Sequence, residues 1–236
     1  MTVASAPDLT ADRERLGRTS TAERVADVLR DRIIDGSYRP GARLDELSIT
    51  TSLDVSRNTL REAFRLLAHE RLLEHKLNKG VFVCEKTGAD VADIYRVRRL
   101  LECTAARAVT APLAADAPQP AAADRAVTEA EDAARRGAWT EVGTANVRFH
   151  QAIAALAGSR RVDELMAAVS AELRLVFHTM PDVRGFHEPY LPRNRKILAC
   201  LRAGDGAAAE RLLADYLDDA ESTLLEHLAS LQQPPR

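Results

Sequence analysis

Residues 56–83, SRNTLREAFRLLAHERLLEHKLNKGVFV, constrain the fold of this chain more than any other segment. Ser56 is a preferred helix cap, and the apolar residues after it recur at helical spacing to about Arg71. Residues 72–85 then predict two short strands around Asn78–Lys79–Gly80, which is a hairpin signal. A helix this short needs a neighbour for its apolar side, which comprises Leu60, Ala63, Phe64 and Leu67.

The segment before residue 56 supplies that neighbour. A helix capped near Ser20 ends at Gly36, and a Pro–Gly turn follows it. Asp45 then caps a short helix that continues to about Leu53 and leads through a tight turn into the next helix. Residues 19–86 therefore have the order helix, helix, tight turn, helix and hairpin, which predicts a winged helix-turn-helix domain.

The polar side of the 56–71 helix carries candidate DNA contacts. The formal net charge of the whole chain is −2, so any attraction to nucleic acid must be local. Residues 57–79 contain six Lys or Arg against three Glu. Arginine pairs with guanine or phosphate, although a solvated helix face is the alternative explanation for this spacing. With the hairpin as a wing, the candidates are Arg57, Asn58, Thr59, Arg61, Arg65, Lys76 and Lys79.

A longer stretch around this helix resembles a known family. IIDGSYRPGARLDELSITTSLDVSRNTLREAFRLLAHERLLEHKLNKGVFV, residues 33–83, is similar to the winged-helix domain of the GntR regulators without a gap. The resemblance implies that Arg57, Thr59, Arg61 and the wing tip at Gly80 lie at the DNA.

Two residues depart from the family pattern. Asp54 stands where the turn usually has Gly, and Asp tolerates the left-handed conformation. Arg71 replaces the usual Gly after the recognition helix, where a positive φ would cost an Arg ~1 kcal/mol. We therefore expect the end of this helix to differ from the family pattern.

Beyond a predicted linker at 86–90 the sequence pattern is helical throughout. Amphipathic helices are predicted at 90–111, 121–137, 139–157, 159–180, 193–203 and 207–230, with breaks at 111–122 and 181–192. No alternating strand pattern follows residue 86, so residues 90–232 predict an all-α bundle. The predicted fold class is mostly α, and residues 1–18 predict a disordered lead.

The helical part resembles, more loosely, the all-helical FCD ligand domain of the FadR-like branch of the same family. Arg98 and Glu102 hold its "R...E" pattern in DVADIYRVRRLLECT, residues 90–104. NVRFHQAIAALAGSRRVDEL, residues 146–165, and RKILACLRAGDGAAAERLL, residues 195–213, match later helices. The resemblance implies that residues 90–232 bind an effector and form a dimer.

The FCD domain commonly holds a metal through a carboxylate and three histidines. The matching positions in this chain are Asn146, His150, Asn194 and Tyr216. Only His150 keeps the usual ligand type, because Asn and Tyr are poor ligands for Zn²⁺. His178 and His187 are possible substitutes that sequence cannot place. A zinc site built on Asn146, His150 and His178 is therefore disfavoured, and no cofactor is expected.

The same positions fit a polar cavity that binds a small organic acid directly. The expected effector-binding residues are Arg98, Asn146, His150, Asn194 and Tyr216. Arg98 would add positive charge, although the alternative for it is an i,i+4 salt bridge with Glu102. The alternative for His150 is a hydrogen-bonded core histidine.

The two parts together predict a ligand-responsive transcriptional regulator, most simply a repressor. It would act in the cytoplasm as a homodimer on a palindromic double-stranded DNA operator. In an alternative interpretation the bundle serves only dimerisation. A metal-dependent enzyme is disfavoured, because no HExxH, Gly-x-Ser-x-Gly, Walker or GxGxxG motif occurs. No membrane contact is expected, since no apolar run approaches roughly 20 residues. The three cysteines fit no motif spacing and are expected to be buried, reduced thiols.

Overall fold

The computed structural model describes residues 20–114 and 118–231. The chain divides into two compact units, Met1–Cys84 and Glu85–Arg236. The expected lead at residues 1–18 lies outside the described residues. Within the described ranges, no helix is both long enough and apolar enough to cross a membrane.

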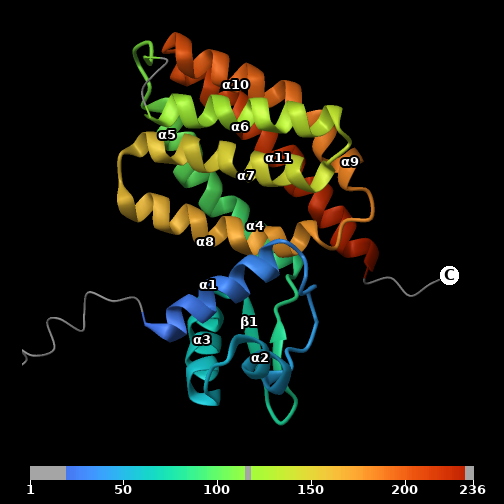
Figure 1. Cartoon of the computed structure of the whole chain (residues 1–236). Helices are drawn as coiled ribbons and strands as arrows, with labels where there is room; N and C mark the ends of the chain where they lie inside the picture. Colours follow the sequence, from blue (N-terminus) through green and yellow to red (C-terminus); the bar gives the residue numbers. More distant parts are fainter. Residues whose placement is uncertain (1–19, 115–117, 232–236) are drawn as a thin grey trace, which may run out of the picture. The chain divides into compact units, whose positions relative to one another are not determined.

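The first unit is a winged helix-turn-helix domain, as the sequence predicts (Figure 1). Ser20 forms a capping box with Glu23 at the start of the first helix, and Ser56 caps the third. The two strands pair antiparallel, with Leu73 opposite Val83 and Lys76 opposite Gly80. The elements are α1 (Thr21–Ile34), α2 (Glu46–Leu53), α3 (Arg57–His69), β1 (Leu73–Lys76) and β2 (Gly80–Val83).

Within residues 20–84 of this unit, three non-glycine residues have a positive φ. Asp54 at the turn between α2 and α3 has φ 51°, and Asn78 at the wing tip has φ 58°. Arg71 has φ 57°, directly after the Glu70 that ends α3. Arg71 thus adopts the positive φ expected for the usual Gly, so the expected difference at this helix end does not appear in the backbone of Arg71. Leu72 and Leu73 are both buried, so the chain must turn sharply here to bring them into the core.

The apolar side of α3 forms the centre of the first unit. Leu60, Phe64 and Leu67 have no exposed surface, and α3 packs against α1. Arg30 of α1 donates two hydrogen bonds of 2.6 Å to the carboxylate of Glu70. This bidentate pair fixes the two helices in register at the end remote from the Ser56 cap.

The second unit is an all-α bundle, which confirms the predicted fold class. Its order along the chain is α4 (Gly88–Arg98), a π-helical turn (Arg99–Cys103), α5 (Thr104–Arg107), α6 (Pro118–Arg135), α7 (Trp139–Ala154), a 3₁₀ turn (Ala155–Ala157), α8 (Arg160–Phe177), α9 (Val183–His187), a 3₁₀ turn (Glu188–Tyr190), α10 (Leu191–Ala203) and α11 (Gly206–Leu231).

Three details of the bundle differ from the sequence-based prediction. The expected linker at 86–90 already contains the start of α4, because Thr87 forms a capping box with Asp90. The expected single helix at 90–111 contains a π-helical turn and ends at Arg107. The expected break at 181–192 contains α9, which Asp182 caps through the backbone N–H of Gly185. Each difference follows from a local cap or turn that hydrophobic periodicity does not register.

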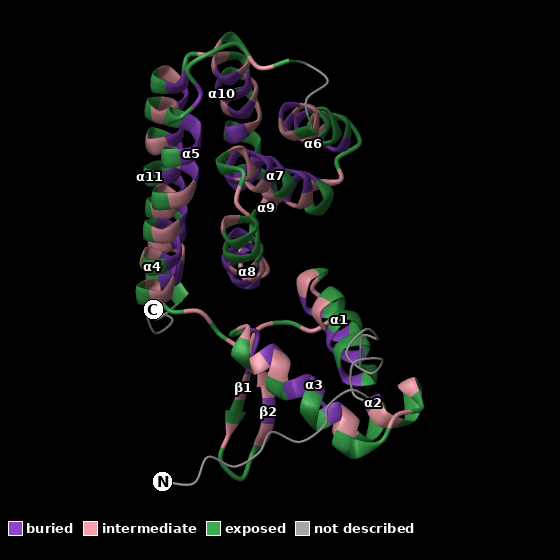
Figure 2. Ribbon diagram, turned by 90° about the vertical axis from the view of Figure 1, so that its left-hand side faces the viewer, coloured by how far each residue is buried: buried purple, intermediate pink, exposed green. Residues whose placement is uncertain are grey.

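The helices of the bundle surround one large apolar core, and a smaller apolar cluster lies between α6 and α7. α6 lies along α7, while α11 lies along α4 and α5 and also contacts α10 (Figures 1 and 2). The buried faces of these helices point toward one another, and their exposed faces point outward (Figure 2). The three cysteines are half-buried free thiols rather than fully buried ones.

A buried ion pair fixes the beginning of the bundle. Lys86, which lies just before α4, donates to Glu172 of α8 at 2.7 Å. The two side chains are only 5% and 9% exposed. Removing one partner would leave an uncompensated buried charge, so this pair holds the start of the second unit against α8.

Candidate functional site

The polar side of α3 presents its cations to solvent. Arg57, Asn58, Arg61 and Arg65 are all exposed, while Leu60 on the opposite side is buried. Thr59 is half-buried, and its backbone N–H and its hydroxyl both bond to the Ser56 hydroxyl, at 3.1 Å and 2.8 Å. Thr59 therefore contributes to the helix cap as well as to this surface.

A groove of about 450 Å³ runs between α3 and the wing. It brings together Arg61, Arg65, Lys76 and Gly80 among the residues that the sequence singled out. Arg57, Asn58, Thr59 and Lys79 are not part of its lining. Three cations along one groove of this size suit a phosphate backbone.

Glu46 is a member of this groove that the sequence analysis missed. Its Oε2 lies 3.5 Å from Arg61 Nε, and Lys76 lies 3.0 Å from Glu74 and over the ring of Phe82. These exposed pairs orient the two cations at little energetic cost. The signal was present in the sequence as Asp45–Glu46 at the start of α2, but only the fold places α2 beside α3.

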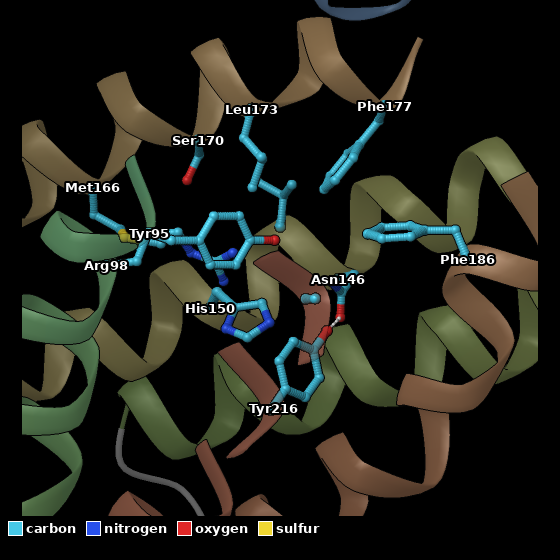
Figure 3. A pocket seen from close by; sticks show the side chains of 12 residues that line it. Tyr95, Arg98, Asn146, His150, Met166, Ser170, Leu173, Phe177, Phe186 and Tyr216 are labelled. Carbon is cyan, nitrogen blue, oxygen red and sulfur yellow. Dashed lines mark hydrogen bonds between the residues drawn. The ribbon is translucent and has the colours of Figure 1, made fainter. Parts of the chain in front are cut away.

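The second candidate site is a group of buried polar side chains inside the bundle. Tyr95 and Arg98 come from α4, Asn146 and His150 from α7, and Tyr216 from α11 (Figure 3). All five side chains point into the space that α8 covers with Ser170, Leu173 and Phe177 (Figure 3). The structure thus brings four of the five predicted effector-binding residues to one cavity.

The fifth residue, Asn194 of α10, is joined to this group without lining the cavity. Its Nδ2 donates to Asn146 Oδ1 at 2.7 Å, and the Tyr216 hydroxyl donates to the same oxygen at 3.0 Å. Asn146 Oδ1 therefore accepts two hydrogen bonds and has no further lone pair to offer. Among residues 20–114 and 118–231, Asn194 Oδ1 is buried without a hydrogen-bond partner.

Glu102 completes the site and joins Arg98 to His150. Its Oε1 accepts from Arg98 Nε at 2.8 Å, and its Oε2 lies 2.6 Å from His150 Nδ1. Burial opposes a charge on this carboxyl, but Arg98 and then His150 outweigh burial and lower its pKa. The i,i+4 salt bridge that was the alternative role for Arg98 is present, and Arg98 lines the cavity as well.

His150 is neutral in these surroundings, and one of its two ring nitrogens has no hydrogen-bond partner. Burial lowers the pKa of the imidazole, and it outweighs the opposing effect of the Glu102 carboxylate. Of the nitrogen atoms in the described ranges, His150 Nε2 is one of the few that are buried without a partner. Sequence reasoning missed the bond to Glu102 because the two residues are 48 positions apart.

The cavity itself is small and has two kinds of wall. Its volume is about 10 Å³, which is on the scale of one water molecule. The polar wall is the group described above together with Ser170, and the Tyr95 hydroxyl points toward the centre (Figure 3). The apolar wall consists of Val147, Met166, Leu173, Phe177, Phe186 and Ala220.

The donor set of this cavity does not fit a transition metal. Asn146 Oδ1 already accepts two bonds, and burial raises the pKa of Tyr216, which keeps the phenol protonated. Only His150 offers a good ligand atom, whereas Zn²⁺ requires at least three. Across the part of the chain that the structure describes, no three His, Cys, Asp or Glu side chains form a metal-holding group.

The two histidines considered as substitutes lie elsewhere. His178 follows the last residue of α8 and does not line the cavity. His187 is buried over Gly143, where a Cβ would come within 2.7 Å of its Nε2. Burial and the nearby Arg174 lower the pKa of His187 to about 4.

Comparison with known proteins identifies both units. Residues 21–83 match the family model "Bacterial regulatory proteins, gntR family", and residues 93–219 match "FCD domain". A solved GntR transcriptional regulator from Rhodococcus sp. RHA1 is 47% identical, with a TM-score of 0.82 over 88% of this chain and 99% of that one.

Two curated relatives match along most of their length. The HTH-type transcriptional regulator YdhC of Bacillus subtilis (strain 168) is 29% identical over 197 residues, which cover 82% of this chain and 86% of that protein. The "Probable D-xylose utilization operon transcriptional repressor" of Paenarthrobacter nicotinovorans is 26% identical over 213 residues, which cover 88% and 90%. The chain therefore belongs to the gntR family of bacterial regulatory proteins, carries an FCD domain, and is a transcriptional regulator rather than an enzyme.

Proposed function

We propose that this regulator is a repressor whose affinity for a palindromic operator depends on a small polar metabolite bound in the FCD cavity. The observation that carries the proposal is His150 Nε2, a buried acceptor without a partner that faces the cavity. Leaving a buried acceptor unsatisfied costs about 1–3 kcal/mol of folding free energy. A bundle that served only dimerisation would gain nothing from an unpartnered His150 Nε2, whereas a ligand-binding site would use it. Because the operator is part of the chromosome, the proposed regulator acts in the cytoplasm.

DNA contact is assigned to the exposed side of α3 and to the wing. Arg57 and Asn58 at the start of α3 would reach base edges, as the first residues of a recognition helix do. Arg61, Arg65 and Lys76 line the groove and would hold the phosphate backbone. Thr59, Lys79 and the Gly80 wing tip complete the proposed contact set.

The second unit is proposed to form the homodimer, with residues 90–232 as the dimerisation part. A regulator that reads two half-sites of a palindrome needs two recognition helices related by a two-fold axis. Light scattering on the full chain at micromolar concentration measures the mass directly. A mass of one chain would contradict this part of the proposal.

The nature of the effector follows from the polar wall. The expectation of a small organic acid rests on Arg98, whose charge is balanced by Glu102 in the structure. The cavity therefore supports a small polar metabolite, with Asn146, His150 and Tyr216 as the groups that orient it.

The proposal is tested in two steps with the full chain. DNA fragments selected by the purified protein give the operator and its half-site spacing. Fluorescence anisotropy on that operator, at fixed salt, then screens small metabolites for a change in affinity. If metabolites bind in the cavity and none of them changes the affinity for the operator, the FCD domain serves only dimerisation.

A further inference from the structure

We propose that the ligand of the FCD cavity is an uncharged molecule that donates a hydroxyl hydrogen bond to His150 Nε2 and buries a small apolar body, as an alcohol or a phenol does. This inference rests on the proposed function, because it assumes that the cavity is the effector site. It goes further by fixing the chemical class of the group that meets the protein.

The tautomer of His150 decides which kind of ligand atom the cavity accepts. Glu102 Oε2 lies 2.6 Å from His150 Nδ1, and an ionised carboxylate can only accept a hydrogen bond. The ring proton must therefore be on Nδ1, and Nε2 presents a lone pair to the cavity. A hydroxyl group satisfies that lone pair by donating to it, whereas a carboxylate oxygen would face it lone pair against lone pair.

A protonated His150 would accept an anion, but the surroundings oppose that state. Burial lowers the pKa of the imidazole and Arg98 acts in the same direction, against the single Glu102 carboxylate. The other groups around the ring are the edge of Phe149 and the Tyr216 ring, neither of which carries charge. An anionic ligand would therefore have to bring a proton with it.

The formal charges around the cavity are already balanced. Arg98 and Glu102 form a buried pair, with 4% and 0% of their side chains exposed. A carboxylate placed beside this pair would be buried without a counter-ion of its own, which is unfavourable in a site that excludes water. An uncharged ligand leaves the Arg98–Glu102 pair undisturbed.

The apolar wall defines the rest of the ligand. Leu173, Phe177 and Phe186 face the polar group from the opposite side of the cavity (Figure 3). Because the present volume is on the scale of one water molecule, the hydroxyl occupies the existing space and the body displaces these side chains. Such a wall suits an aliphatic or aromatic body and offers nothing to a second charged group.

The test compares three ring compounds of similar size on the full chain by isothermal titration calorimetry. Phenol donates a hydrogen bond, anisole has the same ring without the donor, and benzoate is an anion. We expect saturable binding of phenol, and at least tenfold weaker binding of anisole and benzoate. Titrations in two buffers of different ionisation enthalpy should show no proton uptake with phenol.

A substitution at Glu102 should reverse this order. In Glu102→Gln the amide can donate to His150 Nδ1, which moves the ring proton to Nε2 and leaves the Arg98 charge unbalanced. We expect benzoate to bind at least tenfold better than phenol to this variant. Glu172→Gln, which removes a buried carboxylate that does not line the cavity, is the matched control and should keep the order of the native protein.

The outcomes separate this inference from the proposed function. Benzoate binding best to the native protein, with uptake of a proton, would overturn the inference, as would the absence of binding by all three probes. If Glu102→Gln does not fold, the probe order and the proton count of the native protein still decide. Operator anisotropy is measured separately, so phenol that binds without changing operator affinity would refute the proposed regulation and leave the ligand chemistry intact.

Discussion

The arginines of α3 and Arg98 of α4 are the same residue type in opposite environments. Arg57, Arg61 and Arg65 lie in solvent, where Arg61 has only a loose contact with Glu46 at 3.5 Å. Arg98 is 3% exposed and bonds to Glu102 at 2.8 Å. A charge in water remains available for an external partner, whereas a buried charge is committed to its internal partner. The exposed arginines of α3 thus suit the proposed contact with DNA, whereas Arg98 organises the proposed ligand site from within.

The largest expected effect comes from breaking the buried network. Glu102→Ala leaves Arg98 unpaired and removes the acceptor of His150 Nδ1, so we expect it to lower the free energy of unfolding of the second unit by about 3–5 kcal/mol. Trp139 is the only tryptophan and lies in α7, so its fluorescence in a urea titration reports on this unit. Glu164→Ala, which removes an exposed partner of Arg160, should change it by less than about 1 kcal/mol. If Glu102→Ala and Glu164→Ala lowered the free energy of unfolding equally, the contrast between buried and exposed arginine pairs would be wrong.

The buried histidines make the second unit sensitive to acid. The pKa of His187 is lowered from 6.5 to about 4, so its contribution to stability is complete above pH 6.5 and is lost as the pH falls toward 4. The expected loss over that interval is about 3 kcal/mol. Lowered pKa values of His150 and Glu102 act in the same direction. Trp139 fluorescence at several pH values measures the slope, which His187→Gln should reduce.

The exposed arginines should matter for binding and not for stability. Arg61→Ala is expected to weaken operator binding by about 1–3 kcal/mol, because it removes a cation from the groove between α3 and the wing. Anisotropy on the selected operator at fixed salt measures the change. Arg160→Ala, an exposed arginine of α8, is the matched control and should leave the affinity unchanged. Unchanged affinity in Arg61→Ala would remove this residue from the interface.

The smallest expected effect concerns the backbone at Arg71. With φ 57°, this position favours glycine, which reaches the left-handed region without strain. Arg71→Gly and Arg71→Ala remove the same side chain, so the difference between them isolates the backbone. We expect the Gly variant to be more stable than the Ala variant by about 1 kcal/mol, as measured by the calorimetric transition of the first unit. A more stable Ala variant would show that the turn relaxes when the side chain is lost.

Sequence patterns predicted the first unit well because its determinants are local. The caps at Ser20, Asp45 and Ser56 and the apolar side of α3 lie within a few residues of what they stabilise. The turn at Asp54 was expected on the same basis, since Asp tolerates a positive φ. Arg71 was misjudged because the burial of Leu72 and Leu73, which follows from the tertiary fold, overrides its local preference.

The cavity could be predicted only in part. Asn146 and His150 share one helix face by their spacing, so their proximity was accessible from the sequence. The bond between His150 and Glu102 joins α7 to the π-helical turn, and the bonds at Asn146 join it to α10 and α11. Contacts over 48 to 70 positions depend on how the helices pack, which a single sequence does not specify. The unpartnered His150 Nε2 could not be recognised until these bonds were known.

The π-helical turn at Arg99–Cys103 determines how a change of one residue would act on the buried network in descendants of this chain. A π-helical turn holds one residue more than an α-helical turn, and such turns are frequent at functional sites. Deleting one of residues 99–101 would restore an ordinary α-helical turn and leave the helical segments on both sides in nearly the same rotational phase. Glu102 would then lie three positions after Arg98 instead of four, which changes how its carboxylate reaches both Arg98 and His150. Loss of a single codon would thus alter the buried network beside the cavity while leaving α3 unaltered.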